Sequence, residues 1–382
     1  MGVTARDFQA DGAPTDAAGA GDAVATTATG KQHFEVLDGL RGTAAMLVVL
    51  YHIQGITVDF AQGRLMLPHA YLAVDFFFAL SGFVIGYAYD DRWGRMGVAG
   101  FLKARLFRLH PLVILGTLFG FGAYILDPFA GDTQNASVGA LLVALGMGLL
   151  LLPTWPLPNR WLDTHTLNGA SWTLFQEYIA NIAYALVLRR LPTRALGILA
   201  VLAGLVLAAC AVTIGTLDRG YGWDNLGMAP VRLCFPFLTG LWLYRVHDRL
   251  PRSRVGYLPL SLLLILAFAA PSLPEVGGVK LNGVYEAACV LLLFPALVMT
   301  GAHSNPGRGL GRLCAVAGRL SYPLYITHFP FLYVWANFVA HGGAAPSVIT
   351  AVALALIPFE LLVAWASSTL WDMPVRRWLR RY

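Results

Sequence analysis

The residues with the greatest chemical potential lie in the first apolar stretch of the chain. Arg41 stands at its mouth in the run LDGLRG, and His52 follows eleven positions later, after TAAMLVVLY. Eleven residues of α-helix rise about 16 Å, which is roughly half of a ~30 Å hydrocarbon core. Ionisable groups are costly at such depths and are functional candidates by default. We therefore expect a cation at one membrane face and an imidazole near mid-membrane.

Two further ionisable side chains are predicted at a depth close to that of His52. Glu177 lies about 9 Å inside the outer edge of a later apolar segment, and His328 lies about 13 Å from the inner edge of another. Histidine suits general-base chemistry because its pKa lies near neutral pH. We predict His52 as the base, with Glu177 or His328 orienting it or a substrate hydroxyl. A structural role is the alternative for each of these three residues. Asp75 is a further candidate for the site, and a role as a solvated or helix-capping acid is predicted equally well for it.

A second set of candidates is basic. Arg105 and Arg108 in LKARLFRLHP are three residues apart, so they project from one face of a helix. Two guanidinium groups on one face form a fork for phosphate oxygens. Together with Arg41 they are predicted to bind an anionic cofactor or substrate on the cytoplasmic side. The alternative is ordinary anchoring of a membrane protein by cytoplasmic arginines.

The elements that must position these groups are membrane helices. The chain has 382 residues, of which 57% are hydrophobic and only 13% are charged, against about 25% charged in soluble domains. The net charge of +6 comes from arginines in short loops between apolar runs, a pattern typical of membrane topology and not of nucleic-acid binding. The four cysteines show no CxxC or metal-ligand spacing, so no metal site is expected.

The apolar residues group into eleven segments. Their approximate bounds are 40–58, 71–89, 109–127, 138–154, 171–189, 195–215, 227–246, 255–271, 282–300, 320–340 and 347–370. Lysine and arginine cluster in the connections after the second, fifth and seventh segments, before the tenth, and at the C-terminus. The connections 127–137, 271–278 and 341–347 contain neither residue.

These charges indicate which segments cross the membrane. If all eleven crossed, the basic clusters would fall on both sides, against the positive-inside rule. The weakest segment is 138–154, which is short, contains three glycines and ends in PTWPLPNRW. Treating it as a re-entrant or interfacial helix, which is tolerated where protein covers it, places every cluster on one side. We therefore predict an all-α polytopic membrane protein with about ten transmembrane helices, one re-entrant or interfacial helix, and both termini cytoplasmic.

The ends of the chain have a different composition from the membrane domain. Residues 1–32 are rich in Ala, Gly, Thr and Asp, cannot bury a core and are predicted to be a disordered cytoplasmic tail. Residues 33–371 form the predicted membrane domain, and residues 372–382 form a basic cytoplasmic tail. The chain ends soon after the last apolar segment, so we expect the membrane domain to carry out its activity alone.

Five motifs, in order along the chain, carry a resemblance to a known family. FEVLDGLRGTAAMLVVLYH resembles the opening of integral-membrane acyltransferase family 3, whose Arg-x10-His motif falls on Arg41 and His52. The other four are similar to that family's conserved segments: VDFFFALSGFVIGYAY (74–89), RLFR (105–108), SWTLFQEYIANIAYAL (171–186) and SYPLYITH (321–328). The fifth-segment motif departs from the commoner WSLxxEEQFY form, so only Glu177 carries over.

The resemblance implies an O-acyltransferase of the bacterial cytoplasmic (inner) membrane. Its donor would be a cytoplasmic acyl-CoA, commonly acetyl-CoA, and its acceptor a hydroxyl of a glycan, glycolipid or small molecule. Arg41, Arg105 and Arg108 would hold the CoA phosphates, and the pantetheine arm would reach toward His52. Both an acyl-His52 intermediate and direct transfer are compatible with the sequence. The alternative class is a transporter or flippase of envelope glycoconjugates that uses mid-membrane His and Glu as a proton relay.

Overall fold

A computed structural model describes residues 33–61, 63–249, 253 and 255–381. Within the chain, Glu35–Tyr382 forms one compact unit, and the fold below is that of this unit. The disordered tail predicted for residues 1–32 lies outside the described residues.

The unit is built almost entirely of helices. They are α1 Glu35–Thr57, α2 Ala73–Tyr89, α3 Val98–Leu126, α4 Val138–Leu149, α5 Ser171–Leu186, α6 Thr193–Ile214, α7 Met228–Val246, α8 Tyr257–Ala269, α9 Leu281–Ala288, α10 Phe294–Ala302, α11 Gly311–His341, α12 Pro346–Ala366 and α13 Met373–Leu379. Short 3-10 turns occupy Ala70–Leu72, Gly131–Thr133, Leu188–Arg190 and His247–Arg249. Two π-helical segments, Cys289–Leu293 and Ser367–Asp372, join α9 to α10 and α12 to α13. The strands β1 Glu275–Val276 and β2 Val279–Lys280 form one hairpin.

Each of the eleven predicted apolar segments contains a helix, which confirms the all-α class. Among the described residues, six helices are long and apolar enough to cross a membrane: Glu35–Thr57, Ala70–Tyr89, Val98–Leu126, Thr193–Ile214, Leu281–Ala302 and Pro346–Leu379. The chain is therefore an integral membrane protein. The count of about ten crossings and the cytoplasmic position of both termini stay predictions.

The segment predicted not to cross, 138–154, contains α4, which runs alongside α3 before the chain turns back along α3. The carbonyl oxygen of Leu149, the last residue of α4, lies 2.9 Å from His110 Nε2 near the middle of α3. The following loop returns to the far end of α3, where the Tyr124 hydroxyl donates to the Pro158 carbonyl at 3.5 Å. The chain therefore runs beside α3 and turns back along it, and the re-entrant or interfacial membrane placement predicted for 138–154 stays a prediction.

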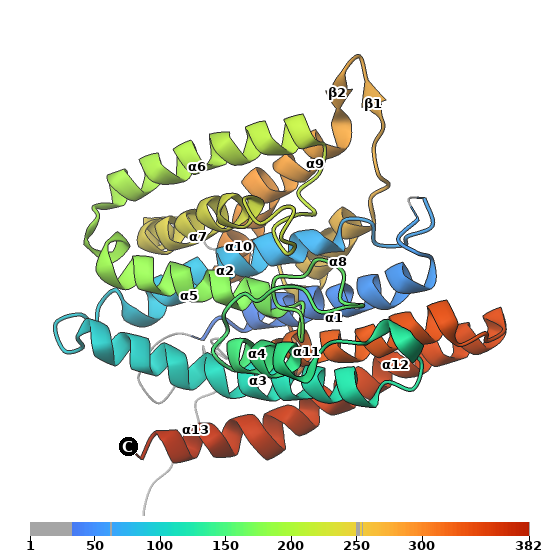
Figure 1. Cartoon of the computed structure of the whole chain (residues 1–382). Coiled ribbons are helices and arrows are strands. Elements are labelled where there is room, and N and C mark those ends of the chain that lie inside the picture. The colour runs from blue at the N-terminus through green and yellow to red at the C-terminus, as the bar shows by residue number, and fades with distance from the viewer. Residues whose placement is uncertain (1–32, 62, 250–252, 254, 382) are drawn as a thin grey trace, which may run out of the picture. The chain divides into compact units, whose positions relative to one another are not determined.

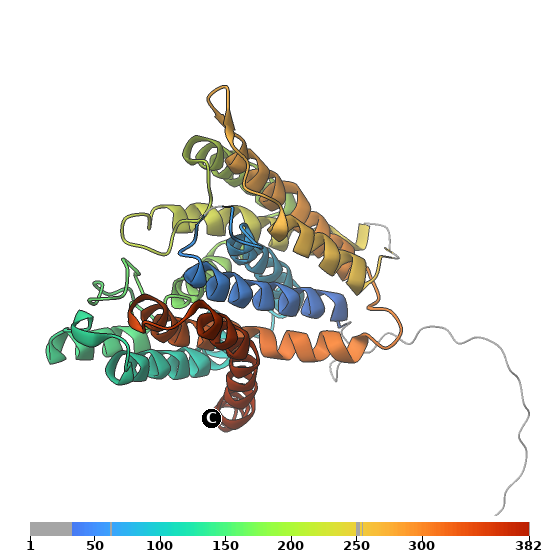
Figure 2. The same ribbon diagram turned by 90° about the vertical axis from the view of Figure 1, so that its right-hand side faces the viewer.

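The helix that carries Arg41 and His52, α1, lies in the middle of the bundle together with α2. Figures 1 and 2 both show α1 and α2 flanked by α6, α7 and α9 on one side and by α3, α11 and α12 on the other. The closest partners are α1 with α11 and α2 with α7. Glycines permit this approach, because a Cβ at Gly42 would meet the Ala317 Cβ at 2.5 Å and one at Gly82 would meet the Phe237 carbonyl oxygen at 2.1 Å. The glycines of LDGLRG and SGF thus let α1 pack closely against α11 and α2 against α7.

The connection between α4 and α5 is a loop that hydrogen bonds hold to neighbouring elements. Its Thr154 amide donates to the Thr164 carbonyl at 2.9 Å, and Asp163 bridges to Gly222 in the connection between α6 and α7. Asn168 fixes it to α11 by donating to the Ile326 carbonyl at 2.8 Å. That carbonyl has no helical donor because residue 330, four positions on, is a proline.

Candidate active site

Two neighbouring cavities contain all six candidate residues. The first, the arginine cavity, has a volume of about 410 Å³, and the second, the histidine cavity, has a volume of about 1110 Å³. The charged lining residues of the arginine cavity are Asp38, Arg41, Arg105, Arg108, Glu177, Arg319, Asp372 and Arg376. These groups give the arginine cavity a formal excess of two positive charges.

Carboxylates hold three of the five arginines in place. The Arg41 guanidinium donates to Asp38 at 2.7 Å, and it also reaches α11 through Ser321 Oγ at 2.9 Å and the Gly318 carbonyl at 3.0 Å. Arg105 is ion-paired with Glu177, and Arg376 with Asp372. A guanidinium fixed by one carboxylate still presents donors to a second anion, because it carries five N–H groups.

The other two arginines have no such partner. Arg108 and Arg319 make no hydrogen bond or ion pair within the part of the chain that the structure describes. Both line the arginine cavity and both are exposed. Guanidinium groups of this kind are suited to hydrogen-bond anionic oxygens such as those of phosphate groups.

The histidine cavity is organised around a contact between α1 and α11. His52 Nδ1 lies 3.3 Å from His328 Nε2, and the two rings stack with centroids 5.4 Å apart. His328 is fully buried, whereas His52 is partly exposed to the cavity that it lines. Both rings line the cavity, and His52 is the more exposed of the two.

The hydrogen bonds define which nitrogen of each ring carries a proton. His328 Nδ1 lies 2.8 Å from the Tyr325 carbonyl oxygen, which only accepts, so Nδ1 is the protonated nitrogen of His328. Its Nε2 then carries a lone pair in the neutral ring and accepts from the Nδ1–H of His52. This assignment leaves His52 Nε2 with a lone pair free to accept a proton.

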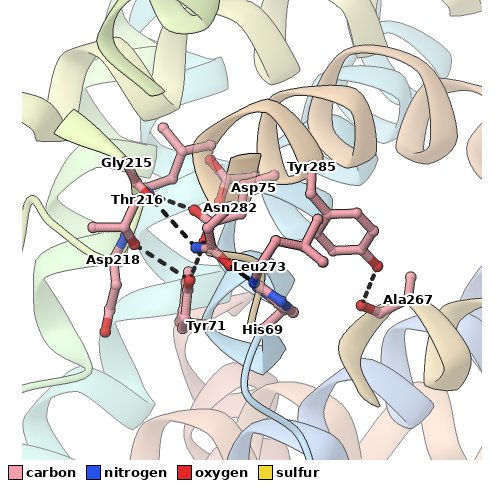
Figure 3. Close-up of polar contacts among 12 residues, drawn as sticks. His69, Tyr71, Asp75, Gly215, Thr216, Asp218, Ala267, Leu273, Asn282 and Tyr285 are labelled. Carbon is pink, nitrogen blue, oxygen red and sulfur yellow. Dashed lines mark hydrogen bonds and ion pairs between the residues drawn. The ribbon is translucent and has the colours of Figure 1, made fainter. Parts of the chain in front are cut away.

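A buried polar cluster forms another part of the histidine cavity wall (Figure 3). The fully buried Glu286 carboxylate accepts hydrogen bonds from the Tyr71 hydroxyl, from Asn282 Nδ2 at 2.5 Å and from the Leu217 amide at 2.5 Å. The Tyr71 hydroxyl also lies 3.3 Å from Thr216 Oγ1. These bonds fix the positions of Tyr71, Thr216 and Asn282, which line the cavity.

Asp75 is neither solvated nor a helix cap. The prediction of a solvated or helix-capping acid is therefore wrong. It is fully buried and its Oδ2 accepts from Arg232 Nη2 at 2.6 Å. Arg232 also donates to the carbonyl oxygens of Tyr71 and Arg219, each at 2.9 Å. A buried charge is tolerated when it is paired and hydrogen-bonded, as both of these groups are. The ion pair joins α2 to α7 beside the cavity.

Three carboxyl groups in the connecting loops also line the histidine cavity, those of Asp163, Asp218 and Asp224, and the pKa of the first two is raised. Burial raises the pKa of Asp218 to about 6, against the opposing effect of the Arg232 charge. Burial raises the pKa of Asp163 to about 7, opposed by the hydrogen bond that it accepts from the Tyr333 hydroxyl at 2.6 Å. Each of these two can be partly protonated near neutral pH.

The predicted catalytic residues divide between the two cavities. His52 and His328, expected at a shared depth, are in contact. Glu177 instead lines the arginine cavity, where it pairs with Arg105 and accepts a hydrogen bond from Ser81 at 3.1 Å. Of the two groups considered for orienting His52, His328 is the one that touches it.

Several residues of the cavities were not identified from sequence. Arg376 was assigned to a basic tail, although its spacing of four from Asp372 is the signature of a helical ion pair. Tyr325 lies in the SYPLYITH motif but carried no prediction, and Asp218 lies in a connecting loop. Only the Asp372–Arg376 spacing offered a signal that the sequence could have revealed.

Comparison of the sequence with known protein families identifies the class to which this protein belongs. Residues 34–366 match the family model described as an acyltransferase domain. The chain therefore belongs to this acyltransferase family, in agreement with the resemblance drawn from its motifs, and it is a membrane acyltransferase.

Two relatives are similar in sequence to this chain, one over most of its length and one over less than half. It is 26% identical to acyltransferase MdmB of Streptomyces mycarofaciens over 375 residues, which cover 90% of this chain and 92% of that protein. It is 38% identical to protein 2 in the picA locus of Rhizobium radiobacter over 169 residues, which cover 40% of this chain and 82% of that protein. No solved structure matches the chain.

Proposed function

We propose that the protein transfers an acyl group, acetyl in the simplest case, from cytoplasmic acyl-CoA to a hydroxyl of a carbohydrate or glycolipid-type acceptor. The observation that supports this most strongly is the arrangement of the two cavities. One presents unpartnered arginines, the other presents a histidine with a free lone pair, and Val74 and Tyr325 line both. A CoA ester that spans this boundary would have its phosphates and its thioester in chemically suited places.

The donor side of the proposal rests on charge. Arg41, Arg105 and Arg108 would bind the CoA phosphates, with Arg319 and Arg376 beside them. Arg41 and His52 belong to the same uninterrupted helix α1, so their eleven-residue separation corresponds to about 16 Å of rise. This distance is comparable to the length of a pantetheine arm.

The acceptor side is proposed to be the histidine cavity. Its volume of about 1110 Å³ is slightly larger than that of most small-molecule sites, about 300–1,000 Å³. Aromatic side chains, including Trp161, Trp172 and Tyr221, line it together with Asp218 and Asn225. Apolar rings combined with hydrogen-bonding carboxylates and amides suit a ligand with apolar faces and many hydroxyl groups.

In the proposed reaction, His52 Nε2 accepts the proton of the acceptor hydroxyl as its oxygen attacks the thioester carbonyl. His328 Nε2 accepts from the other nitrogen of the resulting imidazolium and stabilises it. His52 then returns the proton to the departing CoA sulfur. Glu177 would act on the donor side by holding Arg105, since its hydrogen bonds lie there.

The membrane arrangement that accompanies this function is ten crossings in the bacterial cytoplasmic membrane, with the arginine cavity facing the cytoplasm. Four helices, α5, α7, α8 and α11, would add to the six that qualify by length and hydropathy. In three of them, polar site residues lower the hydropathy: Glu177 in α5, Arg232 in α7 and His328 in α11.

The test is a comparison of ligands on the purified full-length protein. Acetyl-CoA should raise the melting temperature more than acetyl-dephospho-CoA does, and the protein should release CoA thiol from acetyl-CoA. Equal shifts with the two ligands, combined with no thiol release, would favour a transporter or flippase that uses the buried His and Glu groups as a proton relay.

A further inference from the structure

Tyr325 occupies the boundary between the two cavities. It and Val74 are the residues that line both. The Tyr325 ring packs edge-on against Phe77 at 5.5 Å and lies 5.9 Å from the His328 ring, measured between centroids. Because Val74 has no polar side-chain atom, the Tyr325 hydroxyl is the only side-chain hydrogen-bonding group at this boundary among the described residues.

The hydrogen bonds of Tyr325 leave its proton available. Thr173 Oγ1 lies 3.0 Å from the Tyr325 hydroxyl and 3.0 Å from the Ala170 carbonyl oxygen. Thr173 has one hydroxyl hydrogen and can donate to either. When it donates to Tyr325, the tyrosine keeps a hydrogen-bond partner and its own O–H is free to point at a ligand.

We propose that the Tyr325 hydroxyl is the oxyanion donor of the acyl transfer. This inference rests on the proposed function, because it requires a thioester at the boundary with His52. When the acceptor oxygen bonds to the thioester carbon, the carbonyl π electrons move onto its oxygen, which accepts a hydrogen bond from Tyr325. Collapse restores the carbonyl, breaks the C–S bond and sends the sulfur electron pair and the His52 proton out together as CoA thiol.

The position of Tyr325 suits this role in two ways. Its backbone carbonyl fixes the His328 tautomer through the 2.8 Å hydrogen bond. One residue therefore sets the geometry of the His52–His328 pair and the position of the hydroxyl that donates to the oxyanion. Its side chain is buried, and hydrogen bonds to a developing oxyanion are strongest where water is excluded. The residue therefore couples the orientation of the base to the stabilisation of charge.

The test is the kinetics of thiol release from acetyl-CoA, with water as the acceptor, by the full-length protein and four variants. Tyr325→Phe keeps the ring and removes the donor, so kcat should fall about 10²–10³-fold while KM and the thermal shift with acetyl-CoA stay unchanged. Tyr285→Phe is the matched control, because it also loses a phenol hydroxyl, one that donates to the Ala267 carbonyl (Figure 3), and it lines neither cavity.

Thr173→Val separates catalysis from packing. It removes the same Thr173–Tyr325 hydrogen bond as Tyr325→Phe but leaves the tyrosine hydroxyl in place, so its kcat should fall only a few-fold. Equal losses in these two variants, or an unchanged kcat in Tyr325→Phe, would overturn the oxyanion role while leaving the proposed function intact. A wild-type protein that releases no more thiol than His52→Ala would overturn both.

Discussion

His52 Nδ1 and His328 Nε2 lie 3.3 Å apart where α1 packs against α11. The direction of this hydrogen bond is determined by the Tyr325 carbonyl on the far side of His328, which requires a proton on His328 Nδ1. The pair resembles the histidine–carboxylate pairs of hydrolases in logic, because a buried acceptor fixes the tautomer of an accessible base. A neutral imidazole stabilises the resulting cation less than a carboxylate does, so we expect a smaller contribution from the supporting residue.

The difference between an accessible base, His52, and a buried supporting residue, His328, gives the first prediction. His52→Ala should lower acyl transfer by about 10²–10⁴-fold, the usual contribution of a general base, without changing binding of acetyl-CoA. His328→Ala should cause a smaller loss, because His52 Nε2 remains but its tautomer is no longer selected. Thiol release and isothermal titration with acetyl-CoA measure the two properties. Equal activity of His52→Ala and the wild type would remove His52 from the chemistry.

The second prediction concerns the role of Glu177. If its function is to hold Arg105, Glu177→Gln should alter acetyl-CoA binding and leave kcat at saturating donor within a few-fold of wild type. If it acts on the base or the acceptor, kcat should fall and binding should stay constant. Ser81→Ala removes the other hydrogen bond to the same carboxylate and serves as the control for a purely local packing change.

The sequence predicted that His52 and His328 lie at a similar depth, because the rise of a helix per residue is constant. His52 and His328 are 276 positions apart in the chain, yet both were placed near mid-membrane and they do touch. Depth does not say which helices are lateral neighbours. The prediction that Glu177 orients His52 or the acceptor therefore rested on depth alone, and only the packing of α3 against α5 shows that Glu177 pairs with Arg105.

Charges that cancel across helices were the other features that the sequence did not predict. Asp75 and Arg232 are 157 positions apart and each sits in an otherwise apolar segment. Nothing local distinguishes such a pair from two independent polar residues. The cavity residues in connecting loops, such as Asp163 and Asp218, were missed because loops have no periodic pattern from which their direction can be inferred.

The third prediction isolates one phosphate contact. Arg108 lines the arginine cavity without a hydrogen bond or ion pair in the described part of the chain, so Arg108→Ala should weaken acetyl-CoA binding with little effect on stability. The matched control is Lys103→Ala, which removes the same charge from the same helix at a residue that does not line the cavity. Affinity measured at several salt concentrations should depend less steeply on salt in Arg108→Ala than in Lys103→Ala. Identical salt dependence would argue against a phosphate contact.

The fourth prediction links Asp163 to the pH dependence of stability. Asp163 lies in the connection between α4 and α5, and burial raises its pKa from 3.8 to about 7. Between these values the folded protein keeps a proton that the unfolded chain has released, so this group lowers the free energy of unfolding as pH rises from about 4 to about 7. Asp163→Asn removes the titration and can still accept a hydrogen bond from Tyr333.

The melting temperature of Asp163→Asn relative to wild type should therefore increase with pH over this range and level off above about pH 7. Thermal melting followed by tryptophan fluorescence at half-unit pH intervals measures the difference. Asp224→Asn is the control, because it removes the same formal charge from an exposed side chain of the same cavity. A difference for Asp163→Asn that stays constant from pH 4 to pH 8 would show that the carboxyl titrates alike in the folded and unfolded chain.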